Sequence, residues 1–514
     1  MAQKRLREHA DGLWTADARV DRGMTKFFRK HDFSTRMTVI RLSDGGLFIH
    51  SPVRLDDQDL FRLSVDGTRT RERIDGTWHS IRTVTESINV RDADEPELLK
   101  VRVSKLGPVI ADDGRTVLAL SWTGHYGTSP ISAFLRMNRA SSVSDVAAAW
   151  KDAMGPSLHL VAADRDGRLL HQVVGRVPIR ERGAGRLPAP GEDSRWAWQG
   201  FLSFAANPRT LDPPSGWLAV ASHDIFLESD YQASMRFPAD FEPAWRVRRI
   251  RELLSRNDKW SIAQGLELQT DVVSGRARGV LQLLGPEIAA AGGGAKLKAL
   301  QEWNGAMRAE LCAPSVYVSL LNRLADAVGS DEARMASLNV NPIDNTRLVR
   351  LLAGGIHERW WDDVGTTRIE GRADILSTVL SQIERSEFGT WGSQHYVVLR
   401  HPFERLPGLG RSAGRVLSRG PFQASGDETT VAGFACAGPL PTAVSMAPAV
   451  RFVTQPGFWD ETVVVIAGGQ SGRPWSPYYD NQIGPWLAGQ AVTLAFDDSS
   501  VEAATVARLR LEPQ

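Results

Sequence analysis

The order of strand-like and helix-like segments along the chain restricts its fold more than any other feature of the sequence. Short runs of β-branched and aromatic residues, separated by Asp-Gly and Gly turns, fill residues 62–128 and return from residue 391 onward. Between them, residues 240–360 and 367–386 carry apolar side chains at helical spacing. This block order predicts an α+β fold of packed layers and not a regular β–α–β alternation.

Turn residues locate several elements within these blocks. Two strand-like runs, residues 35–42 and 45–53, flank a Ser-Asp-Gly-Gly turn and predict a hairpin. Residues 158–179 read as two strands around a second Asp-Gly turn. Residues 143–154 have a helical pattern, for which Ser144 is the predicted N-cap.

The charge balance disfavours several classes of partner. The 514 residues include 61 Lys and Arg against 60 Asp and Glu, a formal net charge of +1. A balance so close to zero argues against nucleic acid or an anionic membrane as a partner. There is no run of 18 apolar residues to cross a membrane, and the basic N-terminus has no apolar region of the kind that secretory signals carry. From this we expect a cytoplasmic location.

Cysteine and histidine usage gives no metal motif. Two cysteines, Cys312 and Cys436, exclude a disulfide scaffold or a cysteine metal cluster, and we expect two buried thiols. The closest useful histidine pair, His395 and His401, has no metal-ligand pattern. The segment GGQSG at 468–472 lacks a phosphate-loop pattern and predicts a tight turn with glycine at positive φ.

Several longer stretches carry a family resemblance. They are RLPAPGEDSRWAWQGFLSF (186–204), NPRTLDPPSGWLAVASHD (207–224), QEWNGAMRAE (301–310), WGSQHYVVLRHPFERLPGLG (391–410) and GGQSGRPWSPYYDNQIGPWLAG (468–489). With these stretches in family order, residues 56–514 resemble the penicillin acylase (penicillin amidase) family of N-terminal-nucleophile (Ntn) hydrolases.

The resemblance implies a fold and a reaction. The fold is an αββα Ntn-hydrolase sandwich, expected here to be incomplete, with a helical lobe at about 240–386. The reaction is hydrolysis of linear carbon–nitrogen (amide) bonds in a small-molecule substrate, and it needs no cofactor. In the family, a serine at the start of the β chain attacks the carbonyl, and its own α-amino group acts as the base.

The sequence departs from the family at its start. The resemblance begins beyond the position of the nucleophile, and Ser34, Ser43 and Ser51 lack the family's cleavage context. We therefore expect this chain alone to be inactive. Two alternatives remain open: half of a split acylase, completed by an α-chain-like partner that also supplies the serine, or a non-catalytic remnant that binds acyl groups.

The N-terminal residues resemble a different family. Residues 10–55 are similar to the opening strands of a metallo-β-lactamase-like putative hydrolase family, but the zinc cluster of that fold is missing. The chain therefore reads as a chimera of a segment at 1–55 and an acylase-like domain at 56–514. The hairpin of the first segment is expected to pair with the exposed sheet edge of the second.

Two candidate catalytic residues follow from the resemblance. Ser222 stands where family members place the asparagine of the oxyanion hole; the alternative is a loop serine with no catalytic role. Arg246 matches the arginine that orients this asparagine and the substrate; the alternative is one surface arginine in a run of four. A triad of Ser222, His223 and Asp224 is rejected, because neighbouring residues of a strand point to opposite faces.

A calcium site is a further implication of the resemblance. Asp56 and Asp59 match two carboxylate ligands, and Gln58 would offer its backbone carbonyl to a hard cation such as Ca²⁺. The third family carboxylate falls near Met235, and the α-chain ligand is absent. The alternative is a solvated acidic turn.

Overall fold

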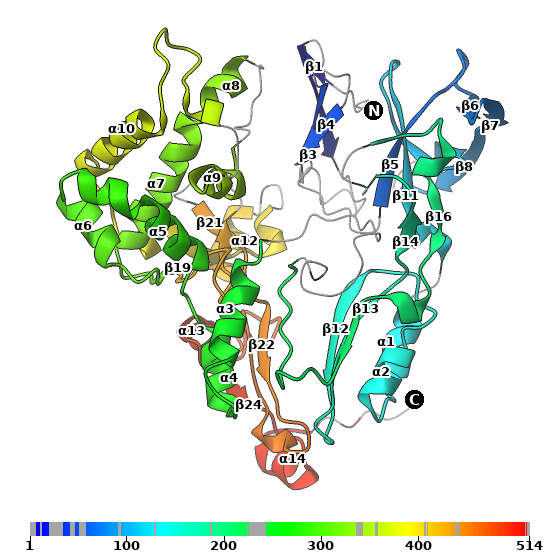
Figure 1. Ribbon diagram of the computed structural model, residues 1–514. Coiled ribbons are helices and arrows are strands. Elements are labelled where there is room, and N and C mark those ends of the chain that lie inside the picture. Colours follow the sequence, from blue (N-terminus) through cyan, green and yellow to red (C-terminus); the bar gives the residue numbers. More distant parts are fainter. Residues whose placement is uncertain are drawn as a thin grey trace. The chain divides into compact units, whose positions relative to one another are not determined.

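The structure is a computed structural model in two units, residues 1–242 and 243–514, which are described separately (Figure 1). It describes residues 58–90, 94–127, 130–183, 185, 188–223, 225, 243–335, 343–354, 358–405, 408, 410–436, 442–508 and 510, together with the backbone of four strands that precede them.

The main sheet of the first unit has six strands. Its order is β15 (Ala189–Pro190), β5 (Gln58–Leu63), β11 (Val117–Trp122), β10 (Gly107–Asp112), β9 (Glu97–Ser104) and β8 (Arg82–Ile88). Neighbouring strands are antiparallel, except that β15 runs parallel to β5. Phe61 lies opposite Ala119, and both are buried in the core of this sheet. The predicted strand-rich character of residues 62–128 is confirmed.

A smaller sheet of the first unit carries helices on one face. Strands β12 (Leu158–Ala163), β13 (Leu169–Val174) and β17 (Arg209–Leu211) pair antiparallel, and α1 (Ile131–Met137) and α2 (Val143–Ala148) lie beside them (Figure 1). The Asp-Gly turn between β12 and β13 is confirmed, with Gly167 at φ 78°. The predicted N-cap Ser144 is wrong: the Ser142 side chain accepts the Asp145 N–H, because the helix begins at Val143.

Two strand pairs complete the described part of this unit beyond residue 57. They are β6 (Arg71–Ile74) with β7 (Thr77–Ser80), and β14 (Pro178–Arg180) with β16 (Trp198–Phe201).

The N-terminal strands form a sheet of their own. Its order is β1 (Arg7–Ala10), β2 (Leu13–Arg19), β3 (Ser34–Arg41) and β4 (Leu47–His50). The hairpin predicted at 35–53 is confirmed as β3 and β4, with Val39 opposite Ile49. The expectation that this hairpin pairs with the edge of the acylase-like sheet is wrong, because β3 hydrogen-bonds to β2 and β4 instead.

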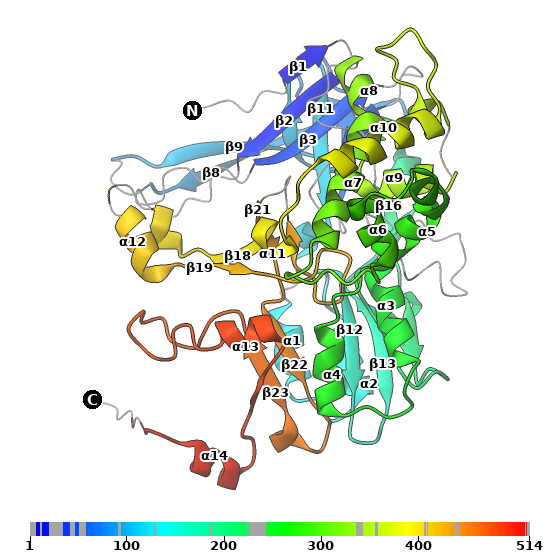
Figure 2. The ribbon, with the colours of Figure 1, turned by 90° about the vertical axis from the view of Figure 1, so that its left-hand side faces the viewer.

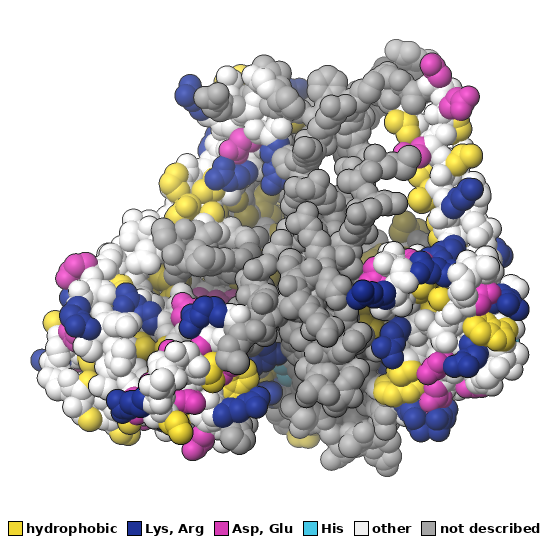
Figure 3. Space-filling model, turned by 90° about the horizontal axis from the view of Figure 1, so that it is seen from above, with side chains coloured by type: hydrophobic (Ala, Val, Ile, Leu, Met, Phe, Trp, Pro, Cys, Tyr) yellow, Lys and Arg dark blue, Asp and Glu magenta, His cyan; other side chains and the backbone are white. Residues whose placement is uncertain are grey.

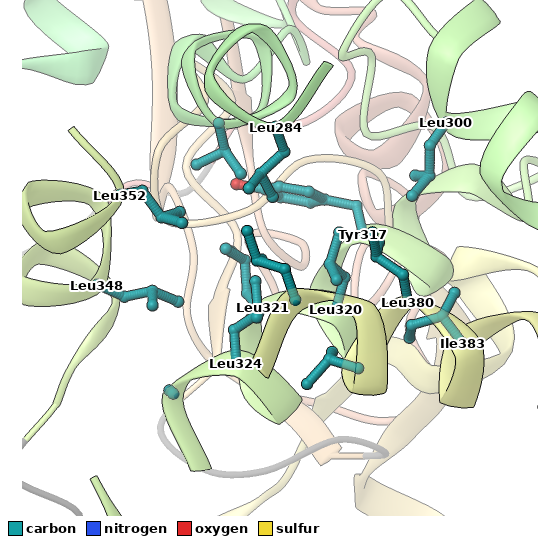
Figure 4. Packing of buried hydrophobic residues seen from close by; sticks show 14 of the residues in the cluster. Leu284, Leu300, Tyr317, Leu320, Leu321, Leu324, Leu348, Leu352, Leu380 and Ile383 are labelled. Carbon is teal, nitrogen blue, oxygen red and sulfur yellow. The ribbon is translucent and has the colours of Figure 1, made fainter. Parts of the chain in front are cut away.

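The helices of the second unit enclose its largest core. The helices are α3 (Trp245–Leu254), α4 (Ile262–Gln269), α5 (Gly275–Ala290), α6 (Ala295–Glu302), α7 (Ala313–Ala327), α8 (Ser330–Met335), α9 (Asn345–Leu352) and α10 (Arg372–Arg385). Leu284, Leu320 and Leu380 lie in this core from α5, α7 and α10, and Tyr317 lies among them (Figure 4). The helical block predicted between residues 240 and 386 is confirmed.

Strands return after α11 (Trp391–Gln394). One sheet has the order β19 (Arg419–Gln423), β18 (His395–Leu399), β21 (Thr442–Met446) and β20 (Ala435–Cys436); another has β22 (Val450–Val453), β23 (Val463–Ile466) and β24 (Val492–Thr493). Helix α4 lies beside β22, and α13 (Ile483–Ala488) lies beside β23 (Figure 2). Helices α12 (Gly410–Leu417) and α14 (Asp498–Ala504) complete the unit. The α+β class is confirmed.

Two smaller expectations need correction. The glycines of the 468–472 segment are not at positive φ; Gly469 is required because a Cβ there would lie 2.1 Å from the Tyr478 carbonyl oxygen. Cys312 and Cys436 form no disulfide; of the two thiols expected to be buried, Cys312 is exposed and Cys436 is partly buried. Among the described residues, every helix is too short or too polar to span a membrane. Acidic and basic side chains are interspersed on the face drawn in Figure 3, in keeping with the near-zero net charge.

Candidate functional site

Ser222 has an unusual backbone conformation. Its φ is +56°, in the left-handed region that few residues other than glycine adopt, and its side chain is half-buried. Residues 217–223 form no strand, so the alternation argument used to reject a triad does not apply here. His223 is buried, with 1% of its surface exposed, and Asp224 lies outside the described residues. Outliers of this kind gather at functional sites, so Ser222 remains a candidate.

Arg246 lies in the first turn of α3, in the second unit, and is half-buried. Its neighbours in the arginine run differ in their surroundings. Arg249 is buried and forms a two-point ion pair with Asp271, at 2.9 and 2.7 Å. Ser222 and Arg246 belong to different units, and each is described within its own.

Asp59, a predicted calcium ligand, forms a buried ion pair. Its two carboxylate oxygens accept hydrogen bonds from Arg180 Nε at 2.8 Å and Arg180 Nη2 at 3.0 Å. Trp198 Nε1 donates to the same carboxylate, and the Arg180 guanidinium lies over the Trp198 ring. Asp59 is 4% exposed and Arg180 is 5% exposed, so this residue lies in the core and not in a solvated turn.

The remainder of the predicted calcium site is only partly described. Asp56, Met235 and the side chain of Gln58 lie outside the described residues, while the Gln58 backbone pairs with Trp122 in the β5–β11 ladder. In the described part of the chain, no cluster of three or more His, Cys, Asp or Glu side chains could hold a metal ion. Because Arg180 and Trp198 already engage the Asp59 carboxylate, its geometry does not favour a cation.

A pair of facing histidines, of which His171 is buried and His159 partly buried, was not expected from the sequence. His159 of β12 and His171 of β13 face each other, with Nδ1 of the first 3.0 Å from Nε2 of the second and with stacked rings. Burial lowers the pKa of His171 to about 4, aided by the charges of His159 and His223. Burial and His223 also lower the pKa of His159. The three residues are separated by 12 and 52 positions (171−159 and 223−171), so local sequence carries no signal for the group.

A second unexpected group lies in the second unit. The buried Arg276 guanidinium contacts Asp427 at 3.3 Å and Glu428 at 2.6 Å, and its Nε donates to the Tyr317 hydroxyl. Burial and the neighbouring Glu428 charge raise the pKa of Asp427 to about 6, whereas Arg276 lowers the pKa of Glu428. Arg276, Asp427 and Glu428 line a cavity of about 430 Å³ together with Trp391, His395, Cys436 and residues of α7. Such a group can bind polar ligands or exchange a proton near neutral pH.

Comparison with known proteins identifies the chain's relatives. The family model described as penicillin amidase matches residues 49–503. An acyl-homoserine lactone acylase (QuiP) of Pseudomonas aeruginosa is 24% identical, with 87% of this chain and 59% of the relative aligned. A penicillin acylase 2 proenzyme of a Pseudomonas species is 27% identical, with 90% of this chain and 60% of the relative aligned. The chain thus spans about three fifths of the length of these relatives.

A solved structure supports the fold. The thermostable penicillin G acylase of Alcaligenes faecalis aligns with a TM-score of 0.58 and 15% identity over 89% of this chain and 87% of that one. The predicted α+β Ntn-hydrolase fold is therefore confirmed. The family match begins at residue 49, close to the predicted boundary at 56. The resemblance of residues 10–55 to a metallo-β-lactamase-like family is not supported by these comparisons.

Proposed function

The chain belongs to the penicillin amidase family, and on this premise we propose that it is the larger part of an amidase that cleaves linear amide bonds of small acylated molecules. The observation that carries the proposal is the family match over residues 49–503. Because the resemblance begins beyond the family's nucleophile, the proposal includes a separate segment that supplies the N-terminal serine and its α-amino base. This chain alone is then catalytically impaired.

Ser222 has the role of a hydrogen-bond donor in this proposal. A hydroxyl can donate one hydrogen bond to the oxyanion that forms when the amide carbonyl is attacked. The left-handed backbone at Ser222 supports the role, because non-glycine residues at positive φ are uncommon and are enriched at functional sites. By the family resemblance, Arg246 is proposed to orient the substrate.

The substrate is proposed at the level of a class. The relatives are named as acylases of acyl-homoserine lactones and of penicillins, both of which are acyl amides. We infer an acyl amide whose leaving group is a small amine. The alternative is that the chain binds acyl groups without cleaving them and that no other segment supplies a nucleophile.

The test compares the chain alone with a complemented chain. Alone, it should leave phenylacetyl and long-chain acyl anilides uncleaved, and mass spectrometry should find one polypeptide. The complement is the part of the Pseudomonas penicillin acylase 2 proenzyme that this chain does not match, supplied by co-expression. The amidase proposal expects cleavage of one anilide above background. Acyl binding without cleavage in the complemented sample would favour the alternative.

Variants of the complemented enzyme test the role of Ser222. Removing one oxyanion donor costs about 10²–10³ in kcat, so Ser222→Ala should lose activity on this scale. Ser222→Asn, which places an amide donor at the same position, should retain activity. Ser215→Ala is the matched control, because the exposed Ser215 hydroxyl donates only to the nearby Trp217 carbonyl, at 3.0 Å. Equal activity of the Ser222→Ala and Ser215→Ala enzymes would contradict the assigned role.

A further inference from the structure

The cavity of about 430 Å³ in the second unit has the features of a binding site for a small molecule. Helix α7 contributes Val318, Leu321 and Asn322 to its lining, and the start of α9, the Trp391 ring and the loop that precedes β20 complete it. Sites for small molecules are typically cavities of about 300–1,000 Å³ with apolar walls and a few convergent polar groups. The size and the mixed lining of this cavity therefore suit a small organic molecule.

The polar groups of the cavity form a network around Arg276. Its Nη1 contacts Glu428 Oε1 at 2.6 Å, and its Nη2 contacts Asp427 Oδ2 at 3.3 Å. Its Nε donates to the Tyr317 hydroxyl at 3.3 Å, so all three guanidinium nitrogens have partners. An anionic ligand would have to displace one of these partners to reach Arg276. The network therefore disfavours an anion.

The network carries more negative than positive charge. Asp427 and Glu428 both contact Arg276, which is the one arginine or lysine among the described residues that line the cavity. Thr429 donates two hydrogen bonds to the Asp427 carboxylate but brings no charge. Burial and the Glu428 charge raise the pKa of Asp427 to about 6 in spite of the contact with Arg276. One guanidinium therefore does not balance two carboxylates, and the surplus charge favours a cationic ligand.

His395 is the second potential cation of the lining. Its Nδ1 and Nε2 lie 2.9 and 3.0 Å from the carbonyl oxygens of Ala424 and Phe434, so its nitrogens already have backbone partners. Burial lowers the pKa of His395, whereas the hydrogen bonds with these two carbonyl groups act in the opposite direction. In either protonation state the carboxylates of the lining, which also include Asp326 and Asp344, outnumber its cations.

Glu428 is the carboxylate of the network that a ligand can reach. Its side chain is 46% exposed, whereas that of Asp427 is 4% exposed. Glu428 contacts Arg276 through Oε1, so its second oxygen can accept a hydrogen bond from a ligand. The side-chain amides of Asn322 and Asn345 also line the cavity, and their carbonyl oxygens are further acceptors.

The lining suits an organic cation better than a metal ion. Among the described residues, no cluster of three or more His, Cys, Asp or Glu side chains could hold a metal ion. A hard cation such as Ca²⁺ takes about six to eight oxygen ligands, whereas a protonated primary amine needs acceptors for three N–H groups. The hydrocarbon part of such an amine can pack against the apolar side chains of Val318, Leu321 and Trp391.

We propose that this cavity binds a small organic cation, a protonated primary amine with an apolar body, whose ammonium group contacts the Glu428 carboxylate. The inference rests on the contacts within the second unit and does not depend on the proposed amidase function.

Three probes of similar size and different charge test the proposal: phenylethylammonium, phenylethanol and phenylpropanoate. Their binding to the purified chain is measured by titration calorimetry at pH 7. Phenylethylammonium is expected to bind at least about 10-fold more tightly than phenylethanol, because a hydrogen bond between two charged groups is about twice as strong as one between neutral groups. Equal affinities of the cation and the alcohol, tighter binding of phenylpropanoate, or no binding of the cation at millimolar concentration would overturn the proposal.

The variant Glu428→Gln tests the position of the ammonium group, because it keeps the shape of the side chain and removes its charge. It should bind phenylethylammonium at least about 10-fold more weakly and phenylethanol with unchanged affinity. The matched control is Glu387→Gln. Glu387 lies outside the lining, is 93% exposed and pairs with Lys296, so this variant should bind all three probes like the unaltered chain. Unchanged affinity of the Glu428 variant, or an equal loss in both variants, would overturn the proposal.

A second measurement decides the matter if the Glu428 variant does not fold. Hydrogen exchange of the unaltered chain is compared with and without phenylethylammonium. Peptides that cover residues 343–347 and 427–434 should gain protection, whereas peptides of β5 and β11 in the first unit should not. Protection elsewhere or none at all, or protection of these peptides by Ca²⁺ and not by the amine, would overturn the proposal. None of these measurements requires enzymatic activity, so failure of this site and failure of the proposed amidase are distinguishable.

Discussion

The substitution Arg180→Met should lower the free energy of unfolding of the first unit by more than the removal of an exposed charge does. Methionine keeps much of the length of the side chain but removes the hydrogen bonds to Asp59 at 2.8 and 3.0 Å. The Asp59 carboxylate then stays in a buried environment with Trp198 as its remaining described side-chain donor. The cost is dominated by this uncompensated buried charge and not by the attraction that is lost.

The structure sets the magnitude of this effect. Removing one partner of a buried, hydrogen-bonded ion pair typically costs about 3–5 kcal/mol, and both partners here are 5% exposed or less. The double variant Asp59→Leu/Arg180→Met removes both charges and should recover all but about 1–2 kcal/mol. The matched control is Arg168→Met. Arg168 pairs with Asp212 at 2.6 Å, but both side chains are about half exposed, so the loss should stay below about 1 kcal/mol.

Urea denaturation with hydrogen exchange in β5 and β14 measures the stability of the first unit separately from that of the second. The expected order of stability is the unaltered chain, the Arg168 variant, the double variant and last the Arg180 variant. A loss below about 1 kcal/mol for Arg180→Met, or an equal loss for Arg168→Met, would refute the reasoning.

Calcium provides a separate test of Asp59. A ligand that binds only the folded state stabilises it by about 2.7 kcal/mol at one hundred times its dissociation constant. Because both oxygens of Asp59 face Arg180, we expect millimolar Ca²⁺ to leave the stability of the first unit unchanged. A calcium-dependent gain that Asp59→Asn abolishes would instead support the predicted calcium site.

Three further predictions concern the second unit. Leu320→Ala, in the helical core, should lower its stability by about 2–5 kcal/mol in urea denaturation, and a loss below about 1 kcal/mol would contradict the packing described. Burial and a hydrogen bond with Asp331 raise the pKa of Glu332 to about 7, so this unit should lose stability as pH rises from 4.5 through 7; Glu332→Gln should flatten that profile, and an unchanged slope would contradict the assignment. Burial raises the pKa of the Cys436 thiol to about 11, so its alkylation at pH 8 should be more than about 100-fold slower in the folded than in the unfolded chain; equal rates would contradict its described environment.

Elements held by local interactions could be predicted from the sequence. The Asp-Gly turn of β12 and β13 and the helical spacing in α7 and α10 depend on residues a few positions apart, and both predictions are confirmed. The N-cap of α2 was missed by two residues, because Ser142 and Ser144 both precede the same apolar stripe and only the position of the first turn distinguishes them.

Interactions between distant residues could not be predicted in this way. Asp59 and Arg180 are 121 positions apart, and Arg276 and Asp427 are 151 apart. In the sequence, LDDQDLF and GDETT are short acidic stretches of the kind that usually stay in solvent. Their burial depends on an arginine from a strand or helix that is distant in the sequence. A single sequence does not show which distant elements pack together.

Ser222 illustrates a third limit, which lies in the backbone itself. The argument against a triad assumed that residues 222–224 are extended, so that neighbouring side chains point to opposite faces. The positive φ of Ser222 shows that this residue is not extended, and the amino-acid composition gives no sign of it. Asparagine tolerates the left-handed region better than serine does, and it is the residue that the family resemblance places here. The conformation of this position therefore agrees with the proposal that Ser222 occupies the place of the family asparagine. For the role proposed for Ser222, the reach of the side chain is what distinguishes serine from asparagine, because the hydroxyl lies closer to its own backbone than an amide nitrogen does.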